Sequence, residues 1–269
     1  MSALTFTLQG EPDQRLDLSP LTPDRLAGMI PSEIAGLELH TTRTRVTAGE
    51  IFKIRRGDTQ QLRFLGGSQR FDWLGAGMTS GSVTLEGDAG AQCGRQMAGG
   101  MLTVHGSVGV YAASGLTGGR LEITGDAGDF AGGPAPGEMA GMAGGLVIVR
   151  GNAGQRAGER LRRGVLIIEG DAQHYAGARM AAGTLVICGK AGRHPGALMQ
   201  RGTILLSGPP AEMLPAFADC GPQDLVIARL MARALAPDSS RAAALFSRKL
   251  RRLAGDMSQL GKGEILLPA

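Results

Sequence analysis

Apolar and polar residues alternate over short stretches that recur along the middle of the chain. Seven consecutive blocks begin at Ser82, Met101, Arg120, Leu146, Val165, Thr184 and Thr203. Each block is 19 residues long except the third, which carries seven extra residues. Positions 2 and 4 of every block are aliphatic, as in Leu166 and Ile168, whereas positions 3 and 5 are mixed. This period of two predicts a short strand at the start of each block, with its apolar face turned inward.

Glycine punctuates the same blocks. Positions 6 and 19 are always glycine, from Gly87 and Gly100 in the first block to Gly208 and Gly221 in the last. A glycine at a fixed position suits a corner with positive φ or a close approach of neighbouring backbones. Position 16 is Met or Leu in six blocks and supplies a second inward row. Because 19 residues hold a strand and its turns but no helix, we predict an all-β fold, a right-handed parallel β-helix of seven to eight coils.

An atypical eighth block precedes the seven. It runs from Gln61 to Gly81, is two residues longer, and contains Trp73 with Phe64 and Phe71 nearby. Terminal repeats usually differ from the others because they close an otherwise open stack. We therefore interpret the aromatic cluster as end-cap packing, with a ligand platform as the alternative.

The flanks lack the repeat and divide the chain into three parts. Residues 1–60 hold an alternating stretch, Leu4 to Leu8, and two short helical turns that start near Pro23 and Pro31. After residue 221, the segments 224–235 and 238–253 show helical periodicity, and the chain closes with a short strand. We predict an N-terminal α/β cap at 1–60, β-helix repeats at 61–221, and C-terminal helices with a last strand at 222–269.

Composition excludes several classes of protein. No apolar stretch approaches the length that spans a bilayer, and the N-terminus lacks the charged start and apolar run of a secretory signal. Cys93, Cys188 and Cys220 are far apart and show no ligand spacing. We therefore expect reduced thiols, a cytoplasmic location and no metal site.

The formal net charge is +4 and the pI is about 9.3, but the chain has no aromatic-lined basic groove or known nucleic-acid module, so we expect no nucleic-acid partner. The arginines recur near one corner of successive blocks, and stacked strands lie about 4.8 Å apart. We predict one basic ridge, which is either a solvated edge with interleaved Glu159 and Glu169 or a docking surface for an acidic subunit or an acidic cofactor tail. The ridge comprises Arg156, Arg160, Arg163, Arg179 and Arg201.

Few residues suggest catalysis. His174, His194 and Asp171 fall near one corner of neighbouring blocks, but without a third ligand or a nucleophile we favour solvent-facing loop residues over an acid–base or metal site. Acidic residues at position 7, such as Asp88 and Asp126, are interrupted by other residue types, so we expect them to bond turn amides. We predict no catalytic and no metal-binding residue on this chain.

Four blocks spell G-x-x-G-x-x-x-G, beginning at Gly87, Gly125, Gly151 and Gly189. This repeat resembles the C-terminal β-helix domain of glutamate synthase, and still more the separate C subunit of formylmethanofuran dehydrogenase. The segments LTPDRLAGMIPSEIAGLEL and GDMSQLGKGEILLP resemble that subunit, and the length fits it. The insertion from Pro134 to Gly141 departs from the pattern, and we expect it to project as a loop from the wall.

The resemblance implies one of two settings. In methanogenic archaea, the C subunit belongs to a tungsten- or molybdenum- and iron–sulfur-containing dehydrogenase. In methylotrophic bacteria, the related protein belongs to a formyltransferase/hydrolase complex, which transfers a formyl group from tetrahydromethanopterin to a methanofuran-type cofactor and releases formate. The chain has 24 Arg against 4 Lys and is rich in Ala and Gly, a bias typical of GC-rich bacterial genomes, so we favour the bacterial complex.

In both settings the resemblance implies that the chemistry is carried out by other subunits. It identifies the chain as a non-catalytic scaffold in a hetero-oligomer with amidohydrolase-like, formyltransferase and dehydrogenase-B-like subunits. It also implies contact with the polyglutamate tail of a methanofuran-type cofactor, without a covalently bound group. A stand-alone glutamate-synthase-like β-helix subunit stays open as an alternative.

Overall fold

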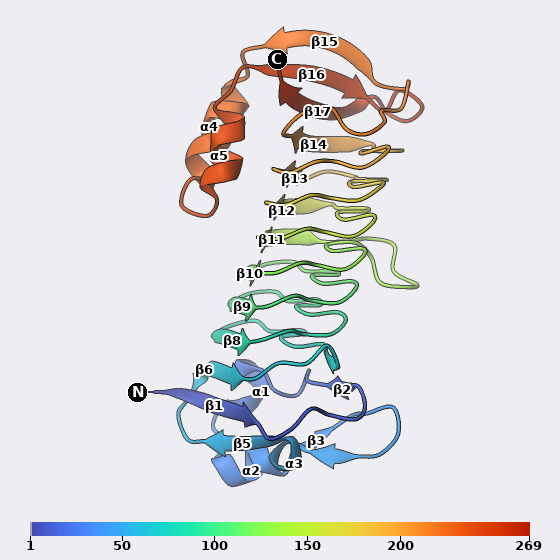
Figure 1. Cartoon of the computed structure of the whole chain (residues 1–269). Coiled ribbons are helices and arrows are strands. Elements are labelled where there is room, and N and C mark those ends of the chain that lie inside the picture. The colour runs from blue at the N-terminus through green and yellow to red at the C-terminus, as the bar shows by residue number, and fades with distance from the viewer. Residues whose placement is uncertain (1) are drawn as a thin grey trace.

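The computed structural model describes residues 2–269 and is mostly strand, with few helices. Thirteen strands form one sheet in the order β15-β16-β17-β14-β13-β12-β11-β10-β9-β8-β6-β1-β5. Figure 1 shows its central strands stacked one above another along the molecule. These strands pair in parallel and comprise β6 (Asp58–Leu65), β8 (Ser82–Glu86), β9 (Met101–His105), β10 (Arg120–Ile123), β11 (Ala143–Val149), β12 (Arg163–Ile168), β13 (Thr184–Ile187), β14 (Arg201–Leu206) and β17 (Lys262–Pro268).

The strand register places equivalent repeat positions side by side. Val83 pairs with Leu102, and Leu102 pairs with Leu121, so position 2 lies against position 2 of the next block. Single bridges join position 8 in the same way, from Ala89 to Val108 and onward to Ala191. The inward side chains at positions 2, 4 and 16 are buried and form one continuous core. The strand predicted at the start of each block is confirmed.

The two glycine positions meet different backbone requirements. Position 19 has positive φ, as at Gly119 with φ 77°, where a side chain would be strained. Position 6 is a close approach: a Cβ at Gly106 would lie 2.4 Å from the carbonyl oxygen of Gly87. Both reasons expected for glycine therefore apply in the repeat: positive φ throughout position 19, and close backbone approach at Gly106 and its equivalents.

The N-terminal cap closes the first end of the sheet. β1 (Ala3–Leu8) pairs in parallel with β6 and in antiparallel with β5 (Phe52–Arg55). Phe6 stacks on Phe64 with centroids 4.6 Å apart, and Phe52 contacts both Phe64 and Phe71. End-cap packing is confirmed for Phe64 and Phe71. The remaining elements of the cap are α1 (Pro23–Leu26), α2 (Pro31–Ala35), α3 (Ala48–Ile51) and the short strands β2 (Leu16–Asp17), β3 (Glu38–Leu39) and β4 (Val46–Thr47). β3 pairs with β4, and β2 pairs with β7 (Phe71–Asp72) of the atypical eighth block.

The C-terminal segment differs from the prediction at its second helix. α4 (Val226–Leu235) and α5 (Ser240–Phe246) form, but the predicted helix over 238–253 is wrong beyond Phe246. Residues Leu250–Gly255 instead form β16, which pairs in antiparallel with β17 and with β15 (Ala218–Gln223). A short apolar run does not distinguish helix from strand, and here the ladder with β17 satisfies the backbone. No helix within residues 2–269 combines the length and apolar character that a membrane crossing requires.

The helices α4 and α5 pack on the outer face of the sheet. Position 3 carries the buried side chains Ile148, Ile167, Val186 and Leu205, which form a second core with Leu235, Leu245 and Phe246 of the helices. In the first three blocks the same position is Thr84, Thr103 and Glu122. The change from polar to aliphatic residues at position 3 therefore marks where the helices cover the sheet. This change is not visible when position 3 is described as mixed for all blocks together.

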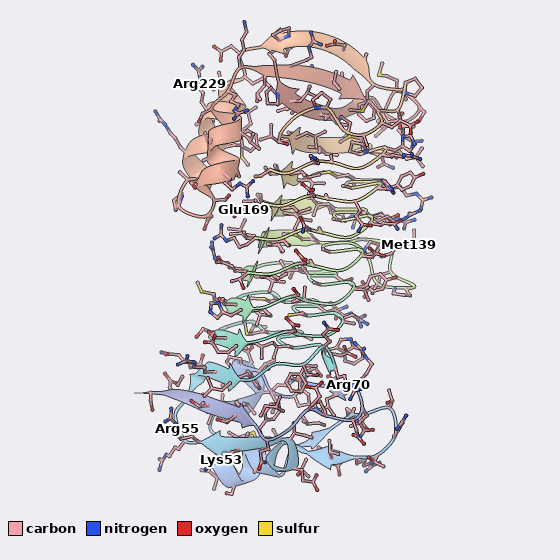
Figure 2. The ribbon with its side chains drawn as sticks, viewed as in Figure 1. Lys53, Arg55, Arg70, Met139, Glu169 and Arg229 are labelled. Atoms are coloured by element: carbon pink, nitrogen blue, oxygen red, sulfur yellow. The ribbon has the colours of Figure 1, made fainter. Side chains whose placement is uncertain are left out.

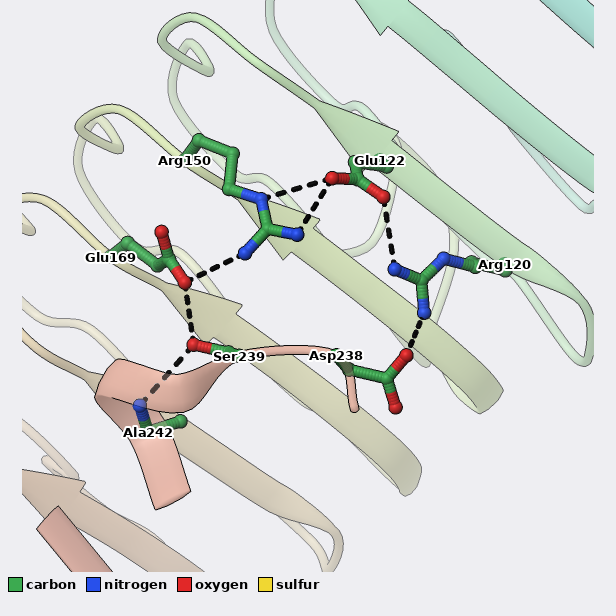
Figure 3. Close-up of polar contacts among 7 residues, drawn as sticks. All are labelled: Arg120, Glu122, Arg150, Glu169, Asp238, Ser239 and Ala242. Carbon is green, nitrogen blue, oxygen red and sulfur yellow. Dashed lines mark hydrogen bonds and ion pairs between the residues drawn. The ribbon is translucent and has the colours of Figure 1, made fainter. Parts of the chain in front are cut away.

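A network of charged groups borders this helix contact (Figure 3). Arg150 donates to Glu122 and to Glu169, each at 2.7 Å, and the Ser239 hydroxyl donates to Glu169 at 2.5 Å. Arg120 joins Glu122 to Asp238 at the start of α5. Burial raises the pKa of Glu122, but the hydrogen bonds from the two arginines outweigh it and hold that pKa below its usual value. The network thus connects three repeats to the turn between α4 and α5.

Candidate functional site: an arginine-lined corner

One corner of the repeat carries two rows of side chains on left-handed backbone. In the first six blocks, the residues other than glycine at positions 11 and 15 have φ between 52° and 62°, a conformation that costs about 1–2 kcal/mol per residue. The rows stack in register, since the Arg160 N–H donates to the Ala178 carbonyl at 2.9 Å and the Arg179 N–H donates to the Ala197 carbonyl at 2.7 Å. The corner therefore presents one side chain per block at each of two neighbouring positions.

Position 11 forms a continuous stack of flat groups. Tyr111 stacks on Phe130 with centroids 4.9 Å apart. The Arg156 guanidinium lies 5.9 Å from the Phe130 ring and 5.4 Å from the Tyr175 ring, and Tyr175 contacts the His194 ring at 5.6 Å. We call these five residues the position-11 ladder. Cation–π contacts at both faces occupy the Arg156 side chain within the ladder.

A buried carboxylate neutralises part of the predicted ridge. The Glu159 side chain is only 6% exposed, and its Oε1 lies 3.3 Å from Arg156 and 3.5 Å from Arg179. Burial of an unpaired charge is unfavourable, so these two arginines stabilise Glu159 in place. Arg156 therefore has internal partners on both sides and offers little charge to a ligand.

Beside Glu159 lies a cavity of about 370 Å³ with an arginine-rich lining. Arg160 and Arg179 enter it from position 15, and Arg162 and Gln200 from position 17. Among residues 2–269, the ion pairs include neither Arg160 nor Arg162, and the Arg160 guanidinium donates instead to the Met139 carbonyl at 3.3 Å. The cavity is lined by Met139, Arg160, Arg162, Arg179, Ala181, Leu198, Gln200 and Gln259. We call this the arginine cavity.

The structure gathers part of the predicted ridge and separates the rest. Arg156, Arg160 and Arg179 lie at one corner, whereas Arg163 and Arg201 are the first residues of β12 and β14 and do not line the cavity. The predicted ridge left out Arg162, although this arginine belongs to the same recurring group, and sequence reasoning missed Gln200 and Gln259. Comparing positions 15 and 17, instead of positions 15 and 18, would have identified Arg162 and Gln200, because alternate positions of an extended chain tend to share a side.

The insertion in the third block anchors to the same corner. The Glu138 carboxylate accepts hydrogen bonds from Arg95 at 2.7 Å, Ser114 at 3.2 Å and Gln96 at 3.3 Å. Burial raises the pKa of Glu138, but the hydrogen bond from Arg95 and further donors outweigh it and lower that pKa. The next residue, Met139, is 80% exposed and lies on a loop at the side of the stack (Figure 2). The insertion thus reaches from the first block to Arg160 in the fourth.

Sequence comparison gives the family. The chain is 52% identical over 265 residues to the C subunit of the formyltransferase/hydrolase complex Fhc of Methylorubrum extorquens, an alignment that covers 98% of this chain and 99% of the relative. The chain belongs to the family of Fhc C subunits. The family resemblance expected from the glycine pattern and the flanks is thereby confirmed.

A solved structure agrees with this family. A chain of the formyltransferase/hydrolase complex FhcABCD from Methylorubrum extorquens, crystallised with methylofuran, superposes with a TM-score of 0.93 and 42% identity, and the match covers 98% of this chain and 99% of that one. The C subunit of the molybdenum-containing formylmethanofuran dehydrogenase 1 of Methanothermobacter marburgensis is 36% identical over 81 residues, 29% of this chain and 20% of the relative. No protein-family model matches the chain.

The histidines predicted as a weak alternative site have separate structural roles. His174 Nδ1 accepts the Arg193 N–H at 3.0 Å, and His194 belongs to the position-11 ladder. Asp171 accepts the Lys190 N–H at 2.6 Å. Equivalent bonds run from Ser107 to Asp88 and from Asn152 to Asp126, so the prediction that position-7 carboxylates bond turn amides is confirmed.

These carboxylates also line a shallow groove of about 640 Å³ on another face. Its floor consists of Ala and Gly at positions 8 and 9, and Asp126, Asp129 and Asp171 stand along it. Each of the three already accepts a backbone N–H from the next block. Within residues 2–269, no three His, Cys, Asp or Glu side chains are grouped so that they could hold a metal.

Proposed function

We propose that this chain is the non-catalytic scaffold subunit of a bacterial formyltransferase/hydrolase complex. The observation that carries the proposal is the 52% identity to the Fhc C subunit over nearly the whole of both chains. The complex transfers a formyl group from tetrahydromethanopterin to a methanofuran-type cofactor and hydrolyses the product to formate. The partners are the amidohydrolase-like, formyltransferase and dehydrogenase-B-like subunits, and the assembly works in the cytoplasm, a location supported by three free cysteines.

The scaffold is a right-handed parallel β-helix with 19-residue coils. Two observations support this architecture: strands pair in parallel with equivalent positions side by side, and position 8 forms a second ladder along the stack. Residues 61–221 form the coils, 1–60 the first cap, and 222–269 the second cap. Such a stack is a stiff spacer because each coil contacts its neighbours along its full length.

Native mass spectrometry of the complex, purified through a tag on this chain, tests the scaffold role. We expect co-purification with the amidohydrolase-like and formyltransferase subunits. We also expect formyl transfer and hydrolysis in the complex but not in the isolated chain. A chain recovered only as a monomer or homo-oligomer, or one that carries out either reaction alone, would overturn the proposal.

The arginine cavity holds the acidic tail of the methanofuran-type cofactor in this proposal. Glu138 supports the idea, because at the same corner arginine, amide and hydroxyl groups already surround a carboxylate of the chain itself. Arg160, Arg162 and Gln200 offer similar donors without a carboxylate partner. Exposed pairs of this kind contribute about 0–1 kcal/mol each, so the tail stays exchangeable. Arg163 and Arg201, at the starts of β12 and β14, extend the ridge beyond the cavity.

Charge reversal tests the tail site. The double variant Arg160→Glu/Arg162→Glu should weaken cofactor binding to the assembled complex about tenfold and flatten its salt dependence. The matched control is Lys53→Glu/Arg55→Glu on β5, at the far end of the molecule (Figure 2). Unchanged affinity and unchanged salt dependence in the first variant would rule the tail site out and leave the scaffold role standing.

A further inference from the structure

The exposed face of α4 carries a compact apolar surface. Val226, Ile227 and Leu230 are 61%, 52% and 55% exposed, although the opposite face of the helix buries Ala228 and Leu235 against the sheet. Residues 226, 227 and 230 share one side of a helix, because side chains three and four residues apart are neighbours. Figure 1 shows that α4 and α5 stand out from the side of the stack, where this face is accessible.

Basic side chains border that apolar surface. A cavity of about 330 Å³ at the start of α4 is lined by three basic residues, Arg229, Arg248 and Lys249, and one acidic residue, Asp224, besides uncharged ones. Arg248 and Lys249 have no acidic partner within 4 Å among residues 2–269, and Arg229 lies 3.9 Å from an 82% exposed Asp224, a contact worth little. We call this cavity the basic notch. Figure 2 shows Arg229 beside the helices, near the C-terminal end of the stack.

The charge of the chain is concentrated in the same region. Residues 222–269 contain eight Lys and Arg against four Asp and Glu, whereas residues 1–221 contain 20 of each. The whole formal net charge of +4 therefore lies in the C-terminal cap. A second copy of this chain is a poor occupant for the apolar surface, because a symmetric contact would bring two basic caps together.

We propose that α4 docks as a helix into an apolar groove of another subunit, whose acidic rim places a carboxylate in the basic notch. This inference rests on the proposed function, which supplies the multisubunit assembly. Val226 or Ile227 and Leu230 are the anchors, spaced by one helical turn as in helix-in-groove recognition. Contact between Arg229, Arg248, Lys249 and an acidic rim then sets orientation and speeds association, and salt weakens it.

The test is reconstitution of the complex from this chain and the other three subunits, followed by native mass spectrometry and titration of complex formation. Ile227→Ser/Leu230→Ser should weaken assembly at least 30-fold. Arg248→Glu/Lys249→Glu should weaken it about tenfold at low salt and less at high salt. The matched controls are Ile30→Ser, with a side chain 56% exposed in the other cap, and Lys53→Glu/Arg55→Glu; both should assemble normally.

The outcomes separate the two proposals. If the unsubstituted chain does not assemble with the three subunits, the proposed function fails. If it assembles and the α4 variants assemble equally well, the docking role of α4 is wrong while the scaffold role stands. A homodimer of the unsubstituted chain that the α4 variants abolish, with hetero-assembly unaffected, also overturns the docking proposal. Circular dichroism of each variant distinguishes a lost interface from a lost fold.

Discussion

At position 7 of the repeat, the side chain in each of the first five blocks accepts a backbone N–H of the next block. Asp171 accepts the Lys190 N–H at 2.6 Å, and Asn152 does the same for Asp171 at 2.8 Å. Because an amide already fills this position, Asp171→Asn should leave stability within about 0.5 kcal/mol. Asp171→Ala should lose about 1 kcal/mol. Denaturant unfolding measures both, with Asp13→Ala at an exposed site as control, and equal losses in the two Asp171 variants would contradict the argument.

The three cysteines should differ sharply in reactivity. Burial raises the pKa of Cys93 to about 12. Burial also raises the pKa of Cys188 to about 11, with a smaller lowering by Arg241 and a smaller increase from Glu169. Cys220, in contrast, is exposed. Since the thiolate is the reactive form, a disulfide reagent at pH 8 should titrate one thiol in the folded chain and three in denaturant. Cys220→Ser should abolish the fast phase. Rapid reaction of Cys188 in that variant would refute this assignment.

At the scale of the elements, position 3 decides where the C-terminal helices lie. Ile167 is fully buried between β12 and the α4–α5 pair. Ile167→Thr introduces threonine, the residue found at the same repeat position, Thr103, in the second block, where no helix covers the sheet. We expect a loss of about 2–3 kcal/mol and faster hydrogen exchange over residues 226–246. Thr103→Ala, at the equivalent position without a helix above it, should change stability by less than about 0.5 kcal/mol. Exchange that rises equally throughout the sheet would argue against a local role.

One carboxylate of the N-terminal cap, Asp24, bonds the end of the first coil, and its effect depends on pH. Burial raises the pKa of Asp24, but hydrogen bonds from Thr79 and Ser80 outweigh it and lower the pKa from 3.8 to about 2. The folded state thus favours the ionised form, so this stabilisation is present above pH 3.8 and is lost as the pH falls from 3.8 through 2. Asp24→Asn should cost about 1 kcal/mol at pH 7, a value reduced for solvent screening. In thermal melts the difference from the unsubstituted chain should shrink below pH 3.8 and vanish below pH 2, and a constant difference would contradict the prediction.

The sequence predicted the strands well because each inward position repeats in every block, so seven observations support one inference. It failed where a feature occurs once. The segment Leu250–Gly255 was predicted as helix from its local pattern, but it forms a strand because it pairs with Lys262–Pro268. Such a tertiary contact leaves no signal in the local sequence. The arginine cavity was half predicted for the same reason. Arg160 and Arg179 share a repeat position, but Met139 comes from the insertion and Gln259 from the turn after β16.

Along the whole molecule, antiparallel strands close both ends of the parallel stack. β5 pairs with β1 at one end, and β16 and β15 follow β17 at the other. These antiparallel strands occupy the place that a further parallel coil would take, so the repeat ends at both of them. Between the two ends, a side chain of one coil has neighbours in the coils on both sides. In the position-11 ladder, stacking on these neighbours stabilises the fold, whereas the left-handed backbone of the same residues destabilises it.

Phe130 allows the stacking and the backbone cost of that ladder to be separated. Its ring stacks on Tyr111 and faces the Arg156 guanidinium, which together should contribute about 1–2 kcal/mol. Its φ of 60° opposes this contribution by about 1 kcal/mol, a cost that glycine does not have. Phe130→Ala should lose the stacking and keep the backbone cost, whereas Phe130→Gly should lose the stacking and remove that cost. Unfolding measurements should therefore find the glycine variant more stable than the alanine variant by about 1 kcal/mol. The reverse order would show that the left-handed corner is not strained, and that stacking alone determines which residues occupy the row.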